Sequence, residues 1–185
     1  MSSSAVLFER LAALVHQSVR DDAARHGLLP IQLQVLAYLA QANRYSDLPI
    51  AVAEYFGITR GTVSQTLSVL ERKGLVARKP DDRHGKRIHL ALTAAGRSVL
   101  AQSWARRLDD ALAQAGHDGG VADAYLKTLL GVLQRQNGHR AFGVCHQCAH
   151  FLVEANGHRC GLTGEPLAAA QTTRICREWS QPRCA

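Results

Sequence analysis

Residues 57–74 read GITRGTVSQTLSVLERKG, and residues 75–93 continue as LVARKPDDRHGKRIHLALT. In the first stretch apolar residues recur at helical spacing behind Thr59, a residue type that caps helices, so we predict a helix over 60–73. In the second stretch two segments of strand character, 75–79 and 87–92, flank a polar turn that contains glycine. The sequence therefore predicts a helix followed by a two-stranded hairpin.

Helical periodicity continues on both sides of this segment. Further helices are predicted over 5–26, 30–43, 48–56 (with Asp47 as its N-cap), 94–115 (capped by Thr93) and 121–136. Helix, tight turn, helix and hairpin, in that order, form a winged helix-turn-helix, whose second helix enters the major groove of DNA. The expected fold class is mainly α with a small β-hairpin wing, that is α+β, with long terminal helices available for dimerisation.

The charge of the chain favours a polyanionic partner. The 185 residues include 22 Lys and Arg against 15 Asp and Glu, a net charge of +7. Eight basic and three acidic residues lie between positions 60 and 87, so most of the excess falls on the predicted helix and hairpin. Nucleic acid and an anionic membrane are the two candidate partners, and we expect double-stranded DNA and no membrane. No run of eighteen apolar residues occurs, which excludes a membrane-spanning segment. The N-terminal stretch lacks the features of a signal peptide, which predicts a cytoplasmic protein.

Hydroxyl and amide side chains can meet base edges or phosphates, whereas basic side chains mainly neutralise phosphate. The alternative for any one of them is the solvated face of an ordinary helix. The residues expected to bind DNA are Arg60, Thr62, Ser64, Gln65, Ser68, Arg72, Arg78, Arg83, Lys86 and Arg87.

The sequence resembles the MarR family of bacterial transcription regulators over roughly residues 5–137. The stretches that carry the resemblance are 57–65, 70–76, 82–87 and 90–96, the last reading LALTAAG. The resemblance implies a homodimer with interlocked terminal helices that represses transcription from a near-palindromic operator. It also implies that Arg83 is the wing arginine that enters the minor groove, with Asp82 bracing the wing. The apolar residues of the terminal helices fit either dimerisation or the core of a monomer.

All five cysteines lie in the last quarter of the chain. Clustered cysteines in a reducing cytosol more often bind metal or perform redox chemistry than form disulfides. Residues 138–185 carry too few apolar side chains for an independent core. We therefore predict two domains, a winged helix-turn-helix and dimerisation domain over 1–137 and a metal-stapled extension over 138–185.

The spacing of the cysteines indicates a four-sulfur metal site. Cys145 and Cys148 form a CxxC, and Cys160 and Cys176 follow singly, so these four are the expected ligands. Structural zinc sites commonly use two paired knuckles, whereas one CxxC with isolated partners is also familiar for iron–sulfur clusters. An iron–sulfur cluster is the expected cofactor, with zinc as the alternative and metal-free thiols as a third reading. Cys184 is interpreted as a free thiol or as an alternate ligand.

These features combine into one functional hypothesis, a DNA-binding regulator whose DNA binding is modulated by an iron–sulfur cluster. The alternative is a repressor that responds to a small aromatic or phenolic ligand and carries a structural zinc. We expect no enzyme, because the sequence shows no catalytic triad, phosphate loop or paired carboxylates in a plausible setting. A CxxC oxidoreductase would also need a thioredoxin-like βαβ pattern, which this sequence lacks.

Overall fold

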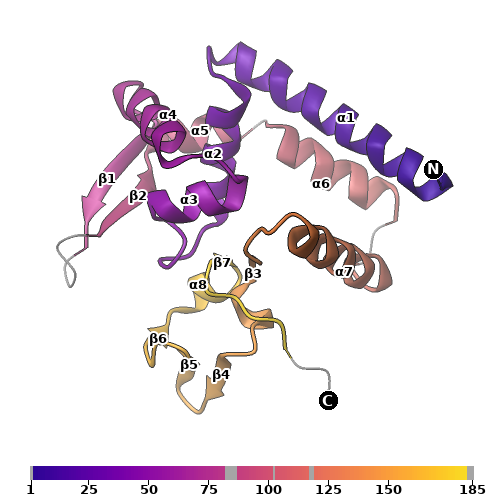
Figure 1. The fold of residues 1–185 in the computed structure, drawn as a ribbon. Helices are drawn as coiled ribbons and strands as arrows, with labels where there is room; N and C mark the ends of the chain where they lie inside the picture. The colour runs from indigo at the N-terminus through magenta and orange to yellow at the C-terminus, as the bar shows by residue number, and fades with distance from the viewer. Residues whose placement is uncertain (1, 82–86, 102, 117–118, 183–185) are drawn as a thin grey trace. The chain divides into compact units, whose positions relative to one another are not determined.

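The computed structural model describes residues 2–81, 87–101, 103–116 and 119–182, and these are mostly helical (Figure 1). The helices are α1 (Ser3–Arg25), α2 (Pro30–Gln41), α3 (Pro49–Phe56), α4 (Arg60–Arg72), α5 (Ala94–Leu100), α6 (Trp104–Gln114), α7 (Val121–Gln136) and α8 (Ala169–Thr172). The strands β1 (Val76–Pro80) and β2 (Ile88–Leu92) pair as the predicted hairpin. The mainly helical fold with a small hairpin wing is confirmed.

The turn between α3 and α4 is built from local signals in the sequence. Gly57 ends α3 in the left-handed conformation at φ 62°, which glycine adopts at little cost. The Thr59 hydroxyl accepts a hydrogen bond from the amide of Thr62 at 3.1 Å, which caps α4. The cap predicted at Thr59 and the helix that follows it are confirmed.

The chain divides into two compact units. The first comprises Met1–Ala40, Thr66–Ala77 and Leu92–Gly119, and the second comprises Gln41–Gln65, Arg78–Ala91 and Gly120–Ala185. The domain boundary predicted between residues 137 and 138 stays a prediction.

The first unit has an aliphatic core in which Leu33, Leu36, Leu67 and Leu70 are fully buried. Within it α1 and α6 lie side by side (Figure 1), and the carboxylate of the buried Asp22 accepts from Arg107 at 3.0 Å.

The long helix predicted over 94–115 is wrong, because α5 ends at Leu100 and α6 begins at Trp104. Ser103 has an extended backbone, with φ −76° and ψ 168°, and is buried as the N-cap residue of α6. Serine at this position favours a helix start over a helix interior. The apolar periodicity on both sides hid this break.

Thr93 and Gly96 fix the start of α5 against the end of α4. The Thr93 hydroxyl accepts from the amide of Gly96 at 3.0 Å and donates to the carbonyl of Gly74 at 2.7 Å. A Cβ on Gly96 would lie 2.2 Å from the carbonyl oxygen of Leu75, so only glycine fits there. The predicted cap at Thr93 is confirmed.

The second unit contains the C-terminal segment, which is made of short elements. Strands β3 (Gly143–Val144) and β7 (Ile175–Cys176) pair antiparallel, and β4 (Phe151–Glu154), β5 (Gly157–Cys160) and β6 (Pro166–Leu167) form a three-stranded sheet. A short 3-10 helix, η1 (Cys145–Gln147), carries the start of the CxxC. We call residues 143–180 the cysteine module.

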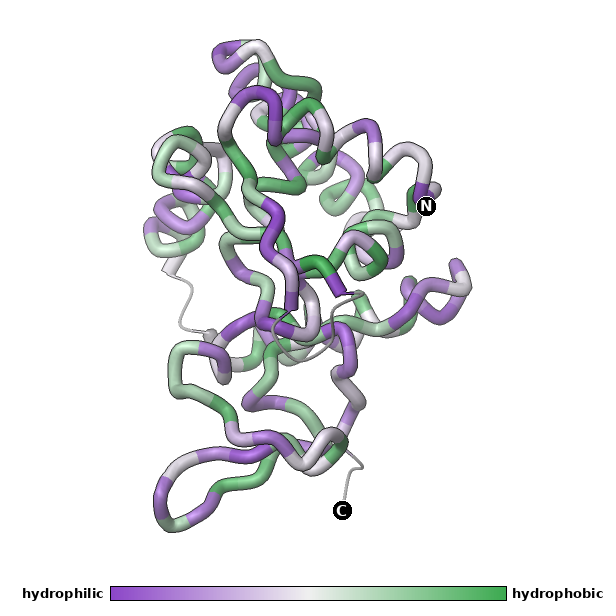
Figure 2. Tube along the Cα trace, turned by 90° about the vertical axis from the view of Figure 1, so that its left-hand side faces the viewer, coloured by the Kyte–Doolittle hydropathy of each residue, from purple (hydrophilic) through white to green (hydrophobic). Residues whose placement is uncertain are grey.

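Green and purple segments alternate along the helical part of the tube in Figure 2, as expected of amphipathic helices. Among the described residues, no helix is both long and apolar enough to cross a bilayer.

Candidate functional site

Helix α4 separates an apolar face from a polar one. Val63, Leu67 and Leu70 are buried, each at most 2% exposed. The predicted DNA-binding residues of the helix are all exposed to solvent: Arg60, Thr62, Ser64, Gln65, Ser68 and Arg72. A polar, basic face without apolar side chains is what a major-groove helix presents to DNA.

The wing adds basic side chains to the second unit. Arg78 on β1 and Arg87 before β2 are exposed, as the sequence predicts. Arg83, Lys86 and the bracing residue Asp82 lie outside the described residues, so their predicted roles stay predictions.

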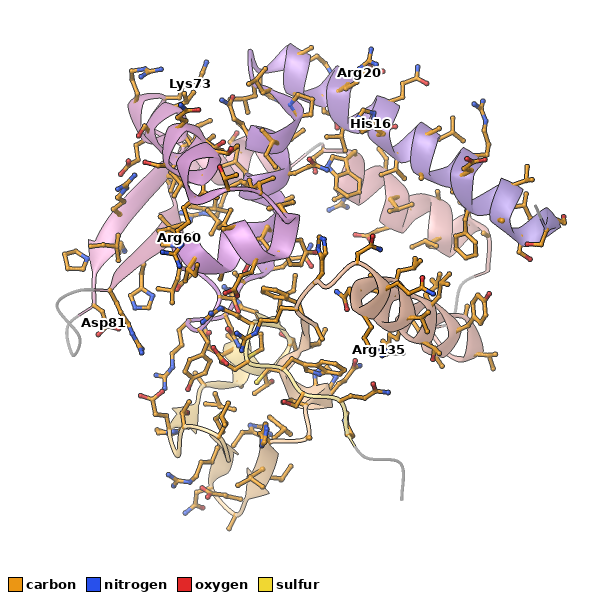
Figure 3. All side chains as sticks on the ribbon, viewed as in Figure 1. His16, Arg20, Arg60, Lys73, Asp81 and Arg135 are labelled. Carbon is orange, nitrogen blue, oxygen red and sulfur yellow. The ribbon has the colours of Figure 1, made fainter. Side chains whose placement is uncertain are left out.

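A histidine lies between two carboxylates at the end of β1 and the start of β2. We call this end of the two strands the base of the wing. His89 on β2 meets Asp47 Oδ1 through Nδ1 at 2.6 Å and Asp81 Oδ2 through Nε2 at 2.9 Å. Figure 3 labels Asp81 at the end of β1 and Arg60 at the start of α4. The N-cap predicted at Asp47 is wrong, since Leu48 takes that position and the Asp47 side chain binds His89.

Protonation of this triad follows from its geometry. Burial lowers the pKa of His89, but its hydrogen bonds to Asp81 and Asp47 outweigh burial and raise the pKa above its ordinary value of 6.5. Burial raises the pKa of Asp47, and the bond to His89 only partly offsets it. The structure therefore favours a charged imidazolium bridging the two acids.

The four cysteines predicted as ligands are free thiols in the cysteine module. Cys145 and Cys176 are buried in one small core with Leu167, and Cys160 packs against it. Cys148 Sγ accepts from the backbone amides of His150 at 3.5 Å and Ser180 at 3.4 Å. The structure thus places Cys145, Cys160 and Cys176, which lie up to 31 positions apart in the sequence, around one small core.

The thiols of the module influence one another. Burial, with smaller contributions from Cys176, Cys160 and Cys148, raises the pKa of Cys145 to about 11. Burial also raises the pKa of Cys176, against the lowering effect of Asn43 and of the Glu178 backbone amide. Within the described residues, however, no group of three or more His, Cys, Asp and Glu side chains is placed to hold a metal ion.

Two histidines near the cysteines contact a backbone carbonyl and an aromatic ring. His146 Nδ1 lies 3.1 Å from the carbonyl oxygen of Thr172. The ring of His158 stacks on Phe151 with 5.0 Å between the ring centroids.

Comparison with known proteins agrees with this arrangement of elements. Residues 26–87 match the model of the MarR family. That segment begins before α2 and reaches the start of β2, so it covers the helix-turn-helix and the first strand of the MarR-like wing. No curated protein sequence matches the chain.

Solved MarR-type structures share the fold. MepR of S. aureus in its DNA-binding conformation superposes with a TM-score of 0.62 at 24% identity, covering 72% of this chain and 100% of MepR. CouR of Rhodococcus jostii RHA1, bound to p-coumaroyl-CoA, gives 0.54 at 21% identity, covering 73% and 92%. A MepR–DNA complex gives 0.51 at 20% identity, covering 75% and 98%. At these identities the likeness establishes a shared fold.

Sequence reasoning missed the residues that join α3 to the cysteine module. Arg177, next to a predicted ligand, binds Glu54 of α3 through Nε at 2.5 Å and Nη2 at 2.8 Å. This pairing holds the pKa of Glu54 below its ordinary value. The partners are 123 positions apart, and no local pattern marks either of them.

Proposed function

We propose that this protein is a MarR-type, sequence-specific DNA-binding transcription regulator, and a repressor. One observation carries the proposal: α4 buries its apolar face and turns hydroxyl, amide and guanidinium groups to solvent. Those groups are the types that read base edges and neutralise phosphates. The MepR–DNA complex, built on the same fold, supports a duplex partner. A DNA partner would place the protein in the cytoplasm.

We propose further that it works as a homodimer on a near-palindromic operator. Large apolar side chains on α1 and α7 remain exposed, from 43% to 87%. They are Val6, Leu7, Leu11 and Leu14 on α1, and Val121, Tyr125, Leu126, Leu130 and Leu133 on α7. Two apolar helix faces of this kind mark an interface, and a two-fold protein matches a two-fold operator.

Selection from a random duplex library tests the DNA proposal. We expect a palindromic motif to be enriched, and Gln65→Ala to weaken its binding about tenfold through loss of a base contact. Gln17→Ala on the exposed part of α1 is the matched control and should bind like the wild type. If the library yields no preferred sequence at moderate ionic strength, the proposal is wrong.

The cysteine module is proposed to bind a metal centre through Cys145, Cys148, Cys160 and Cys176, an iron–sulfur cluster rather than zinc. Its donor chemistry fits such a centre. Backbone amides already donate to Cys148, and Asn43 is an additional amide that acts on Cys176. Loading would require the four sulfurs to draw closer together and to lose their protons.

A bound cluster would supply a state that responds to oxygen, nitric oxide, iron supply or redox poise. The chain's own part is to hold the thiolates and shield them: Cys145 and Cys176 are buried, and the Trp179 indole donates to the carbonyl of Gln147 at 3.0 Å across the CxxC. Metal-dependent change in the module would then modulate DNA binding.

An absorbance spectrum with metal analysis of anaerobically purified protein tests this second part. Visible bands and stoichiometric iron are expected, and Cys148→Ser should abolish both. Cys184→Ser is the matched control, which should keep them. A colourless protein with stoichiometric zinc would favour the alternative, a repressor that responds to a small aromatic ligand. Full metal retention in Cys148→Ser would remove Cys148 from the ligand set.

A further inference from the structure

The turn between α2 and α3, residues 42–47, is held by the cysteine module. The amide of Asn43 donates to the carbonyl of Ile175 at 2.9 Å, and the amide of Arg44 donates to Gln171 Oε1 at 2.8 Å. The amide of Arg177 donates to the Ser46 hydroxyl at 2.7 Å. We call these residues the 42–47 turn.

Side chains strengthen this attachment. Glu165 of the module pairs with Arg44 and accepts from the Tyr45 hydroxyl, the latter at 2.6 Å. Beyond the turn, Arg177 forms its two-point ion pair with Glu54 of α3. Planar two-point pairs fix orientation as well as distance, so the Arg177–Glu54 pair orients the module against α3.

The other side of the same turn holds the wing. The carbonyl of Asp47 accepts from the amide of Leu90 on β2 at 2.7 Å, and its carboxylate binds His89. His89 in turn reaches Asp81 at the end of β1. One short turn thus contacts both the cysteine module and the base of the wing.

Asn43 connects these two sides. Its side chain is 1% exposed, and its Oδ1 accepts from the amide of Tyr45 at 3.0 Å and from the Ser46 hydroxyl at 2.9 Å. Its backbone carbonyl accepts from the amides of Ser46 at 2.9 Å and Asp47 at 3.0 Å. The Asn43 side chain and backbone therefore organise the whole turn.

The remaining polar group of the Asn43 side chain is its buried amide nitrogen, Nδ2. Among the described residues it has no acceptor within hydrogen-bond distance, although the Asn43 backbone is bonded to Ile175, the residue that precedes Cys176. A thiol is a weak acceptor, whereas a metal-bound thiolate carries charge and accepts strongly. A buried donor without an acceptor is costly, so a loaded Cys176 would give Asn43 the partner it lacks.

We propose that Asn43 senses the loading of the cysteine module and that the 42–47 turn passes this state to the base of the wing. The inference rests on the proposed metal site and names its route of regulation. Loading draws the Asn43 amide toward Cys176, the turn follows because its backbone hydrogen bonds converge on Asn43, and Asp47 moves the strand that carries His89 and Leu90. The wing's approach to DNA then depends on the metal.

The test measures the DNA dissociation constant of the full chain, metal-loaded and after stripping with a chelator. For the wild type we expect the two values to differ about tenfold, as a coupling between two sites of one protein commonly does. Asn43→Asp keeps the acceptor oxygen and removes the donor, and it should bind metal yet reduce the ratio to about twofold or less.

A second variant guards against misfolding of the first. Glu54→Gln weakens the attachment of the module at a partly exposed position and should also diminish the ratio. Glu154→Gln is the matched control, because Glu154 pairs with Arg159 at 2.6 Å within the module's own hairpin, and it should keep the wild-type ratio.

The outcomes separate the two proposals. If the wild type holds no metal, the proposed cysteine site is wrong. If the wild type holds metal and shows the ratio, but Asn43→Asp and Glu54→Gln keep it in full, the route through the turn is wrong and the metal site stands. The route is also wrong if the DNA dissociation constant of the metal-loaded wild type does not change when the metal is stripped.

Discussion

Gly96 illustrates how a single residue can decide where two elements meet. Its α-carbon lies against the carbonyl of Leu75, and a Cβ there would come within 2.2 Å of the oxygen and 3.1 Å of the carbon. Backbone atoms cannot swing aside as a flexible side chain does. The glycine in the LTAAG segment is therefore a packing requirement of α5 and not only a helix-start signal.

We expect Gly96→Ala to lower the free energy of unfolding by about 3 kcal/mol, at the upper end of overpacking effects. Chemical denaturation monitored by circular dichroism measures it. Gly131→Ala, within α7, is the control: the nearest atom to its new Cβ is the end of Arg135 at 3.4 Å, so it should be neutral or stabilise the protein by up to about 1 kcal/mol. Equal stability of the two variants would contradict the close contact at Leu75.

His89 makes the stability of the wing base depend on pH. The charged groups that face it are Asp47 and Asp81, and its pKa is raised relative to 6.5. A raised histidine pKa means that the folded state binds the proton more tightly, so this stabilisation is complete below 6.5 and is lost as pH rises through the folded pKa. Burial raises the pKa of Asp47 above its ordinary value of 3.8, against the lowering effect of its hydrogen bond to His89.

The measurement is the thermal midpoint of wild type and His89→Gln between about pH 5.5 and about pH 9. The stability advantage of the wild type should be largest at the acid end and shrink toward the alkaline end. An advantage that stays constant, or grows with pH, would show that His89 is not held as an imidazolium.

At the scale of elements, α4 shows how one helix serves core and surface together. Its apolar residues recur every three or four positions and are buried, and the positions between them carry the polar groups. The break between α5 and α6 shows the converse. There the periodicity continues past a serine that the backbone uses to start a new helix.

Basic residues of α4 should act through phosphate. Arg72→Ala is expected to weaken binding to all duplexes alike and to reduce the slope of log affinity against log salt by about one. Lys127→Ala, an exposed basic residue of α7, removes the same charge and should leave the slope unchanged. Titrations of labelled duplex at several salt concentrations measure both. A specificity change without a slope change would assign Arg72 to a base instead.

At the scale of the whole molecule, the uncovered apolar faces of α1 and α7 predict a dimer. Leu130→Glu places a charge on the exposed face of α7, where the wild-type leucine is 52% exposed, and should shift the protein to monomer. Val153→Glu on β4 is the control, since that valine is 76% exposed in the cysteine module and should not affect assembly. Sedimentation equilibrium at matched concentrations distinguishes them, and a monomeric wild type would contradict the interface.

The sequence alone determined several elements of the winged helix-turn-helix: α4 with its buried and exposed faces, the hairpin, and the caps at Thr59 and Thr93. The helix faces and caps depend on residues within four positions of one another, and the hairpin depends on two strand-like segments around one short polar turn, so local patterns suffice to locate them. The spacing of the four cysteines also singled them out as a group, and their joint binding of a metal stays a prediction.

Only the tertiary structure decided what the 42–47 turn touches. Asp47 was predicted as a cap because its local sequence suits one, but His89, 42 positions away, takes its side chain instead. The Ser46–Arg177 bond spans 131 positions, and the Glu54–Arg177 pair spans 123. Contacts across such separations are fixed by packing and register, which the chain acquires only when it folds, and local sequence carries no trace of them.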